Sequence, residues 1–210
     1  MKKKLCFTRF ITLISVFLIT TACLPSLSYS DSRRIIVFAE QQWVVQNSFW
    51  KQINPGNNYF SSDEKSVFVD DEGKLHLIAR YDINLGSWVC AQISSLENAK
   101  YGTHTFIIEN NLEKLDRNIV LGTFLYKSDQ DNTKKRAEID IEFSKWGFPK
   151  EIENGETVDI DYNSWYVLWP EWEDGECPKP QSVDGFMLNM EDYEYSLHQI
   201  QWEDFYLSFR

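Results

Sequence analysis

The sequence is poor in the side chains that hold metal ions. Its 210 residues include three histidines and four cysteines, and neither type occurs at the spacing of a metal site. His76, His104 and His198 are scattered without Cys or His companions, which predicts structural or surface positions. We therefore expect no metal site from these residues and no cofactor, while structural calcium binding stays open.

Positive charge is also scarce. The chain contains 21 Lys and Arg against 32 Asp and Glu. Residues 1–30 hold four of the basic residues and no acidic one, so the remainder carries 17 basic and 32 acidic side chains, a net charge of −15. Proteins bind nucleic acids largely by neutralising phosphates with Lys and Arg. The balance therefore argues against a nucleic-acid partner, and it suits a soluble exported protein that meets an uncharged polysaccharide.

Long helical patterns, internal repeats and low-complexity linkers are absent. Short β-rich runs recur instead, separated by polar turns. This pattern predicts one all-β domain over residues 31–210, folded as a sandwich of two antiparallel sheets. The expected strands are Ile35–Ala39, Trp43–Gln46, Ser66–Val69, Leu75–Tyr81, Trp88–Ser94, Thr103–Glu109, Ile119–Lys127, Ala137–Ser144, Trp165–Leu168, Phe186–Leu188, Ser196–Trp202 and Phe205–Phe209.

Two connecting segments have a distinct character. Residues 70–73, Asp-Asp-Glu-Gly, predict a hairpin turn, because Gly73 supplies the positive φ that such turns need. The acidic run Glu171–Glu176 is followed by two prolines and predicts an irregular loop. Cys90 and Cys177 are the two cysteines of the domain; an oxidising compartment allows them to pair, but their distance in sequence leaves the pairing open.

The first 30 residues predict a secretory signal rather than a membrane span. A basic start, Lys2–Lys4, precedes the mostly apolar run Phe10–Ala22, and small residues favour cleavage before Asp31. The alternative is a lipoprotein signal over residues 1–22, since the segment ending at Cys23 resembles a bacterial lipobox with Thr20 in place of the usual Leu. The first alternative predicts a secreted or periplasmic protein. The second predicts a lipid anchor at the envelope, the one case in which a membrane is a partner.

The run Ala137–Gly147, A-E-I-D-I-E-F-S-K-W-G, alternates acidic with apolar residues. In a strand this places Glu138, Asp140 and Glu142 on one face, expected to meet water, and the apolar residues on the other, expected to meet a core. Asp140 would hydrogen-bond one glutamate and repel the charge of the other, which separates their pKa values. The same pattern also suits an exposed strand whose charges block edge-to-edge pairing.

The spacing of the carboxylates bears on their chemistry. Glu138 and Glu142 start about 13 Å apart at the backbone of a strand. Long side chains that lean inward on a concave sheet can approach the separation of about 5 to 5.5 Å that a retaining glycosidase needs. One of the two would then act as nucleophile and the other as acid.

The motif E-I-D-I-E resembles the signature of glycoside hydrolase family 16, E-[I/L]-D-[I/F/V]-E, found in lichenases, laminarinases and xyloglucan-modifying enzymes. This resemblance implies a concanavalin A-like jelly roll, with Glu138 as nucleophile, Asp140 as its assistant and Glu142 as acid/base. It covers most of residues 49–209. The further segments that carry it are 54–61, 70–77, 88–92, 101–103, 120–126 and 196–202.

The resemblance also suggests residues that line a sugar cleft. Phe124 and Tyr126 fall on one face of their strand, and aromatic planes bind the C–H faces of pyranose rings. Gln92 stands where many relatives have Glu. Trp146 shares the parity of the carboxylates if the strand continues that far. Trp165 and Trp169 share parity with each other, without an assigned role.

The implied activity is that of an exported, endo-acting β-glucan hydrolase of the retaining type, with a polysaccharide as its partner. Sequence does not separate hydrolysis from transglycosylation, and it leaves the glycan and the oligomeric state open. The sequence departs from the family pattern in two places. Some relatives have a disulfide whose first cysteine corresponds to Ser61 or Ser62 here and whose second corresponds to Cys90, so this disulfide is expected to be absent. The family's closing strands are expected to be missing after Phe209, which would leave an exposed terminal strand. The alternatives are a non-catalytic, lectin-like sandwich and an inactive remnant of such an enzyme.

Overall fold

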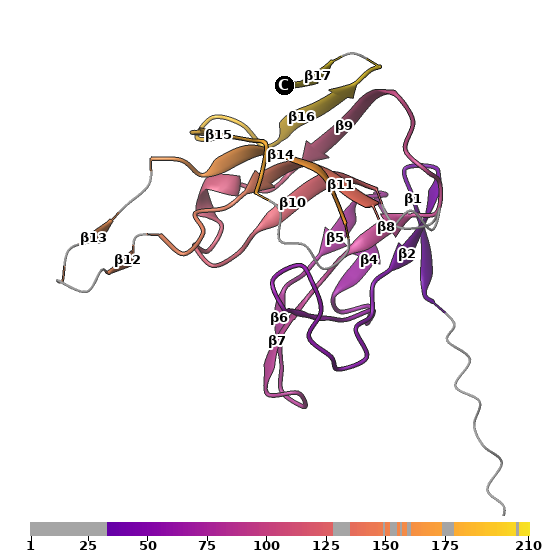
Figure 1. Cartoon of the computed structure of the whole chain (residues 1–210). Coiled ribbons are helices and arrows are strands. Elements are labelled where there is room, and N and C mark those ends of the chain that lie inside the picture. Colours follow the sequence, from indigo (N-terminus) through magenta and orange to yellow (C-terminus); the bar gives the residue numbers. More distant parts are fainter. Residues whose placement is uncertain are drawn as a thin grey trace, which may run out of the picture. The chain divides into compact units, whose positions relative to one another are not determined.

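The computed structural model describes residues 33–127, 135–148, 150–151, 155, 157–158, 161–173, 179–204 and 206–210. Over these residues the chain is all-β, as the sequence predicts, with several antiparallel sheets and no α-helix. Contacts divide the chain into two compact units, Met1–Leu96 and Glu97–Arg210. Figure 1 traces their strands in chain order. In the described ranges, no helix has the length and apolar character needed to cross a bilayer.

The first unit is made of short strands in three small sheets. All pairs are antiparallel except β3 with β7, which run parallel. The sheets are β1 (Ile35–Phe38), β2 (Gln41–Val45) and β8 (Ile93–Ser95); β3 (Tyr59–Phe60), β7 (Ser87–Cys90) and β6 (Arg80–Asp82); and β4 (Val67–Val69) with β5 (Leu75–Leu77).

The predicted turn between β4 and β5 is confirmed. Gly73 has φ +81°, and its N–H donates to the carbonyl of Asp70 over 3.0 Å. The Asp70 side chain accepts bonds from two further backbone N–H groups and meets His76 Nε2 at 2.7 Å. The bond with His76, followed by the backbone N–H of Lys74, lowers the pKa of Asp70. The hairpin therefore combines a glycine backbone with a side-chain lock.

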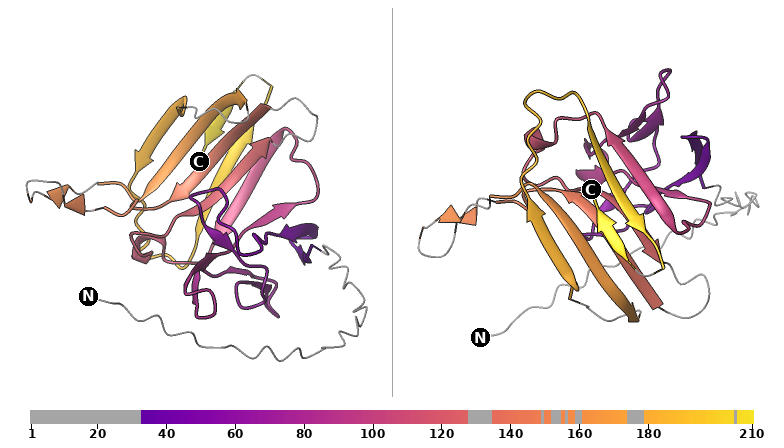
Figure 2. Two further views of the ribbon diagram at one scale, coloured as in Figure 1. Left: turned by 60° about the horizontal axis from the view of Figure 1, so that its bottom comes forward. Right: turned by 90° about the horizontal axis from the view of Figure 1, so that it is seen from above.

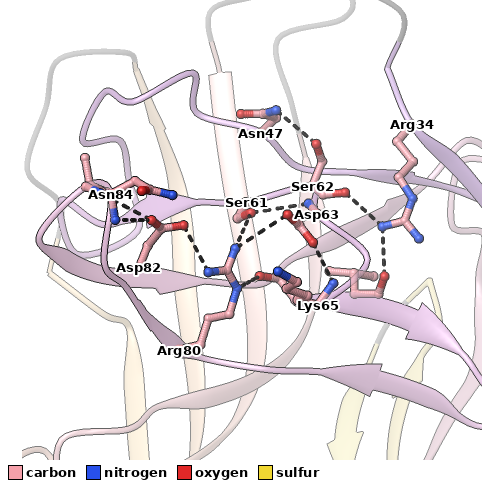
Figure 3. A network of polar contacts seen from close by, with 12 residues as sticks. Arg34, Asn47, Ser61, Ser62, Asp63, Lys65, Arg80, Asp82 and Asn84 are labelled. Carbon is pink, nitrogen blue, oxygen red and sulfur yellow. Dashed lines mark hydrogen bonds and ion pairs between the residues drawn. The ribbon is translucent and has the colours of Figure 1, made fainter.

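A polar network holds the loop between β3 and β4 (Figure 3). Arg80 donates from Nε to Ser66 Oγ over 2.9 Å and from Nη1 to Asp82 Oδ2 over 3.0 Å. Arg34 donates to the carbonyls of Ser62 and Val67 over 2.9 and 2.8 Å. These charge-assisted bonds fix a loop that has few apolar side chains of its own.

The same loop lies beside Cys90. The N–H of Ser61 donates to the carbonyl of Cys90 over 3.1 Å, next to the parallel β3–β7 pair. Ser61 has a hydroxyl that accepts a bond from Arg80 where a disulfide would need a thiol. Cys90 has no disulfide to another described residue. The proposed alternative partner, Cys177, lies outside the described residues.

The second unit contains two larger sheets and a short hairpin. Its four-stranded sheet has the order β10-β11-β14-β15, and its three-stranded sheet has the order β17-β16-β9. The strands are β9 (Gly102–Ile108), β10 (Leu121–Lys127), β11 (Lys135–Phe143), β12 (Lys150–Glu151), β13 (Thr157–Val158), β14 (Ser164–Glu173), β15 (Ser182–Phe186), β16 (Ser196–Trp202) and β17 (Leu207–Phe209), with a 3₁₀ turn at Leu112–Lys114.

The core of this unit lies between its two sheets (Figure 2). Ile141 and Phe143 from β11 and Ile200 from β16 are fully buried in one cluster. Burying a side chain of this kind contributes about 1.5–3 kcal/mol. His198 is also buried, with its ring edge-on to Phe143 at 4.6 Å, and burial lowers its pKa. Of the two predicted kinds of position, structural or surface, His198 therefore has a buried one.

The last strand, β17, lies at the edge of its described sheet, as expected from the sequence, but its apolar face is covered. β17 pairs with β16, and Leu207 and Phe209 pack against the core cluster. The Phe209 ring stacks on Tyr166 of the facing sheet, with centroids 4.6 Å apart. Its apolar side therefore points inward, because alternate residues of a strand face opposite ways. The first residue of the expected strand, Phe205, lies outside the described residues.

Most predicted strands occur within a few residues of their expected bounds, and four predictions were wrong. Leu75–Tyr81 is divided between β5 and β6, and Trp88–Ser94 is divided between β7 and β8. The strand expected at Phe186–Leu188 ends at Phe186. The acidic segment expected as a loop from Glu171 instead extends β14 to Glu173. Residues 174–178 of that segment lie outside the description.

The extension of β14 has a physical cause in its pairing with β11. The backbones of Lys135 and Arg136 pair with those of Glu173 and Trp172, which continues the ladder of β14 beyond the acidic row. The register shifts between Arg136 and Glu138, which leaves Pro170 and Glu171 opposite Ala137. Proline lacks an N–H for the ladder and is tolerated at such a bulge. A loop-like composition is therefore compatible with a strand here.

Candidate active site

Strand β11 occupies an interior position in its sheet. It pairs with β10 on one side and with β14 on the other, over the whole acidic run (Figure 1). An edge strand has one such neighbour. The interpretation of the acids as a device against edge-to-edge pairing is therefore wrong, since no edge exists here to protect.

The alternation of β11 is as the sequence predicts. Ile141 and Phe143 are fully buried, and Ile139 packs against the same cluster. The three carboxylates point to the opposite face, because the side chains of a strand alternate. This face differs from the expectation in one respect: Asp140 is only 3% exposed, and Glu138 and Glu142 are half-buried. The acidic side is a covered site rather than an open surface.

Aromatic residues of the two neighbouring strands cover the acids. Residues directly opposite one another in an antiparallel pair lie on the same face of the sheet. Tyr126 and Trp169 stand opposite Glu138 in this way. Around Asp140 the pairs are Phe124 and Val167, and around Glu142 they are Gly122 and Trp165.

Phe124 and Tyr126 lie on one face of β10, as predicted, while their role in sugar binding stays a prediction. Both share the carboxylate face; Phe124 is half-buried, whereas Tyr126 is 43% exposed. Arg136 donates from Nη1 to the Tyr126 hydroxyl over 2.7 Å, and its guanidinium lies 6.0 Å from the ring centroid. Trp172 lies 6.4 Å from the same ring. Tyr126 is thus an oriented aromatic group at the Glu138 end of the row.

Two other predicted binding residues lie outside the strands of this sheet. The strand ends at Phe143, and Trp146 lies in the following turn with φ +49°, so its parity with the carboxylates does not follow from strand geometry. Its N–H donates to Ser144 Oγ over 2.9 Å, and its side chain is 44% exposed. Gln92 belongs to the first unit, where its carbonyl accepts a bond from Gln46. It is not among the residues that the second unit gathers around its carboxylates.

Asp140 has two polar partners that define its state. The indole Nε1–H of Trp169 donates to Asp140 Oδ2 over 3.0 Å. Asp140 also shares a hydrogen bond with Glu138. The sequence predicted a bond to one glutamate, and the structure identifies which one.

Burial and like charge together raise the pKa values of the row. Burial, then the charges of Glu138 and Glu142, raise the pKa of Asp140 to about 9, and the bond from Trp169 opposes this. Burial and the charge of Glu138 raise the pKa of Glu142 to about 7. Burial also raises the pKa of Glu138, which the bond from Asp140 lowers. Near neutral pH the row therefore holds a proton on Asp140 and a readily exchanged proton on Glu142.

Trp165, Trp169 and Trp172 are site residues to which the sequence assigned no role. The common parity of Trp165 and Trp169 was visible, but their partner strand was not, and Trp172 fell in the segment expected as a loop. Trp165 donates its Nε1–H to the carbonyl of Ser144 over 2.9 Å.

A glycine makes room for the rings beside Trp165. Gly185 stands opposite Trp165. A Cβ there would approach the rings of Tyr162 and Trp165 to 2.8–2.9 Å. Since real side chains do not tolerate such contacts, only glycine leaves room for this aromatic pair.

Comparisons of the chain with protein-family models, curated proteins and solved structures give no match. Within the described residues, no group of three or more His, Cys, Asp or Glu side chains is arranged to hold a metal ion.

Proposed function

We propose that this chain is an exported glycoside hydrolase that cleaves a β-linked, glucan-type polysaccharide by a retaining mechanism. The observation that carries the proposal is a covered row of three carboxyl groups, with separated protonation states and aromatic neighbours on both sides. The resemblance of the E-I-D-I-E motif to glycoside hydrolase family 16 supports the same function, and with it a concanavalin-type jelly roll.

In the first step Glu138 attacks the anomeric carbon. The bond between that carbon and the glycosidic oxygen breaks, and Glu142 gives its proton to the leaving oxygen. The pKa of Glu142, raised to about 7, suits a group that must be protonated and still able to release its proton. Asp140 donates a hydrogen bond to Glu138, so it steadies the carboxylate before attack and as the leaving group of the next step.

In the second step the same groups act in reverse. Glu142, now a carboxylate, takes a proton from water, and the water oxygen attacks the anomeric carbon of the glycosyl-enzyme. The ester bond to Glu138 breaks, and the sugar leaves with its original anomeric configuration. If a sugar hydroxyl enters in place of water, the same chemistry transfers the chain instead of hydrolysing it.

The aromatic residues favour a neutral, ring-shaped substrate. Phe124 and Tyr126 lie on the carboxylate face, where ring planes can bind the C–H faces of pyranoses. The excess of acidic residues in the chain, with a formal net charge of −11, disfavours a polyanionic glycan. A glucan-type polymer fits both features.

The test is an assay of purified protein on β-1,3-glucan, mixed-linkage β-1,3-1,4-glucan and xyloglucan, with Glu138→Gln as the matched control. We expect new reducing ends from the wild type on at least one polymer and none from the variant. NMR of the earliest products should show retained anomeric configuration. Binding without new reducing ends would support a lectin-like module instead, and an inverted product would contradict the assignment of Glu138.

Export is part of the proposal. Cleavage before Asp31 would release the protein, whereas lipid on Cys23 would anchor it at the envelope. Intact-mass measurement of the exported protein distinguishes a chain that starts at Asp31 from one that starts at a diacylated Cys23. A cytoplasmic full-length chain would contradict both.

A further inference from the structure

We infer that Trp169 is a positioning residue that sets the orientation of the Asp140 carboxyl group and the side of it that holds the proton. The inference rests on the proposed function and adds a residue to which the sequence assigned no role. Its basis is a direct hydrogen bond from an aromatic neighbour to the acid row, from Trp169 Nε1 to Asp140 Oδ2 at 3.0 Å.

The hydrogen bond joins residues that are diagonal neighbours across the β11–β14 pair. Trp169 stands opposite Glu138 in the β11–β14 register, and Asp140 stands opposite Val167. Diagonal neighbours on one face of an antiparallel pair are about 7–8 Å apart, a distance that an aromatic side chain can span. A shorter residue at position 169 could not reach the carboxyl group.

The direction of the bond determines the place of the proton. An indole N–H donates and cannot accept, so Oδ2 of Asp140 acts as the acceptor. When Asp140 is protonated, the favoured place for its proton is then Oδ1, which leaves that oxygen to donate to Glu138. Trp169 therefore separates the two oxygens of Asp140 into one that accepts and one that donates.

The surroundings of Trp169 restrict its movement. Its side chain is half-buried and lies 6.5 Å from the ring of Trp172. The register shift at Pro170 and Glu171 follows directly after it, and β14 is held by neighbours on both sides. Bulges next to active sites commonly re-aim side chains, and this one brings Trp169 and Trp172 to the same part of the sheet.

The bond also has a defined electrostatic effect. Donation from Trp169 stabilises the ionised form of Asp140 and opposes the effect of burial on its pKa. Without the donor, Asp140 should hold its proton to a higher pH, with a less defined orientation. Its hydrogen bond to Glu138 would then be weaker during attack on the sugar.

The test compares Trp169→Phe with Trp165→Phe. Both changes remove an indole N–H from the carboxylate face of β14, but the Trp165 N–H donates to the carbonyl of Ser144 instead of to a carboxyl group. Infrared titration of protein with ¹³C-labelled aspartate follows the protonated Asp140 carboxyl, and Asp140→Asn assigns the band. We expect Trp169→Phe to raise the pH at which this band disappears and Trp165→Phe to leave it in place.

Kinetics provide the second readout. We expect kcat of Trp169→Phe to fall about 2- to 10-fold near neutral pH, the range of one hydrogen bond to an uncharged group, with a displaced pH profile. Trp165→Phe should leave the position of the pH profile unchanged whatever its effect on the rate. If Trp169→Phe does not fold, benzothienylalanine at position 169 keeps the ring shape and replaces the N–H with sulfur.

The two readouts separate the inference from the proposed function. An unchanged Asp140 band and pH profile in folded Trp169→Phe or in the benzothienylalanine protein would overturn the positioning role. If Trp169→Phe displaces the Asp140 band and the wild type cleaves no glycan, the role of Trp169 is retained and the hydrolase is rejected.

Discussion

One buried aspartate in each unit shows how different partners give the same side chain opposite properties. Asp82 is 8% exposed and Asp140 is 3% exposed, and both lie on strands. The bond from Arg80, followed by backbone N–H groups, lowers the pKa of Asp82. Asp140 instead shares its face with two glutamates, and its pKa is raised to about 9. Burial disfavours the charge in each case, and the neighbouring charges decide the outcome.

The difference corresponds to two roles. Asp82 stays ionised and joins Arg80 in fixing the loops of the first unit. Asp140 keeps a proton at neutral pH and offers it to Glu138. Asp82, with its cation partner, therefore has a structural role, whereas Asp140, among other acids, can donate a proton at neutral pH.

The largest effect is expected from Glu138→Gln. The change removes the proposed nucleophile, so kcat should fall at least about 10⁴-fold while glycan binding is retained. It also removes one of the charges that raise the pKa of Asp140, which should then fall toward that of Asp82. Reducing-end assays and calorimetric binding measure the two consequences. Residual activity above about a tenth of wild type would contradict the assignment.

Glu142 should determine the alkaline limb of the pH profile. Because the proposed acid must be protonated and its pKa is about 7, activity should decrease about tenfold per pH unit well above pH 7. Glu142→Gln should abolish this limb and spare the first step for activated aryl glycosides, which need little protonation. Initial rates from pH 4 to 10 on natural and aryl substrates provide the measurement. A profile that stays flat above pH 8 on the natural polymer would exclude Glu142 as the acid.

Asp140→Asn and Asp82→Asn should change stability in opposite directions. Between about pH 4 and 9 the unfolded chain ionises Asp140 while the folded chain does not, so the wild type loses stability as the pH rises through this range. Asp140→Asn removes this loss and should melt above the wild type, by more at pH 8 than at pH 5.

The contribution of Asp82 to stability changes with pH in the opposite direction. Its lowered pKa gives stability that is present above about pH 4 and is lost as the pH falls through the folded-state pKa. Asp82→Asn should therefore melt below the wild type at pH 7, and the gap should close in strong acid. Thermal melting with hydrogen exchange in each unit tests both variants. If the melting temperatures of both variants shifted in the same direction, the contrast between Asp82 and Asp140 would be wrong.

The smallest effect is expected from Arg80→Met. The variant keeps the length of the side chain and removes the cation, so the pKa of Asp82 should rise and begin to resemble that of Asp140. The melting temperature should decrease by a few degrees, at about 4–8 °C per kcal/mol for a unit of this size. NMR titration of Asp82 checks the pKa. If it stays low without Arg80, backbone N–H groups alone hold the charge.

Local patterns were enough for the strands and for the faces of β11. Alternation placed Ile141 in the core and Asp140 on the opposite face, and Gly73 marked the hairpin turn. These features depend on residues that are adjacent or two apart in the chain. Where a nonlocal pairing competes with composition, the prediction was wrong, as in the extension of β14 through Pro170.

The sequence by itself determined that the chain is all-β and that three carboxyl groups share one face, because the period of a strand is two residues. Only the tertiary structure decided that β11 is an interior strand, that Tyr126 and Trp169 stand beside Glu138, and that Asp140 is buried with an indole N–H on one oxygen. Strand neighbours come from distant parts of the chain, and a pKa depends on everything within a few ångströms of the group. For this reason the acids could be named from the sequence, whereas their protonation required the fold.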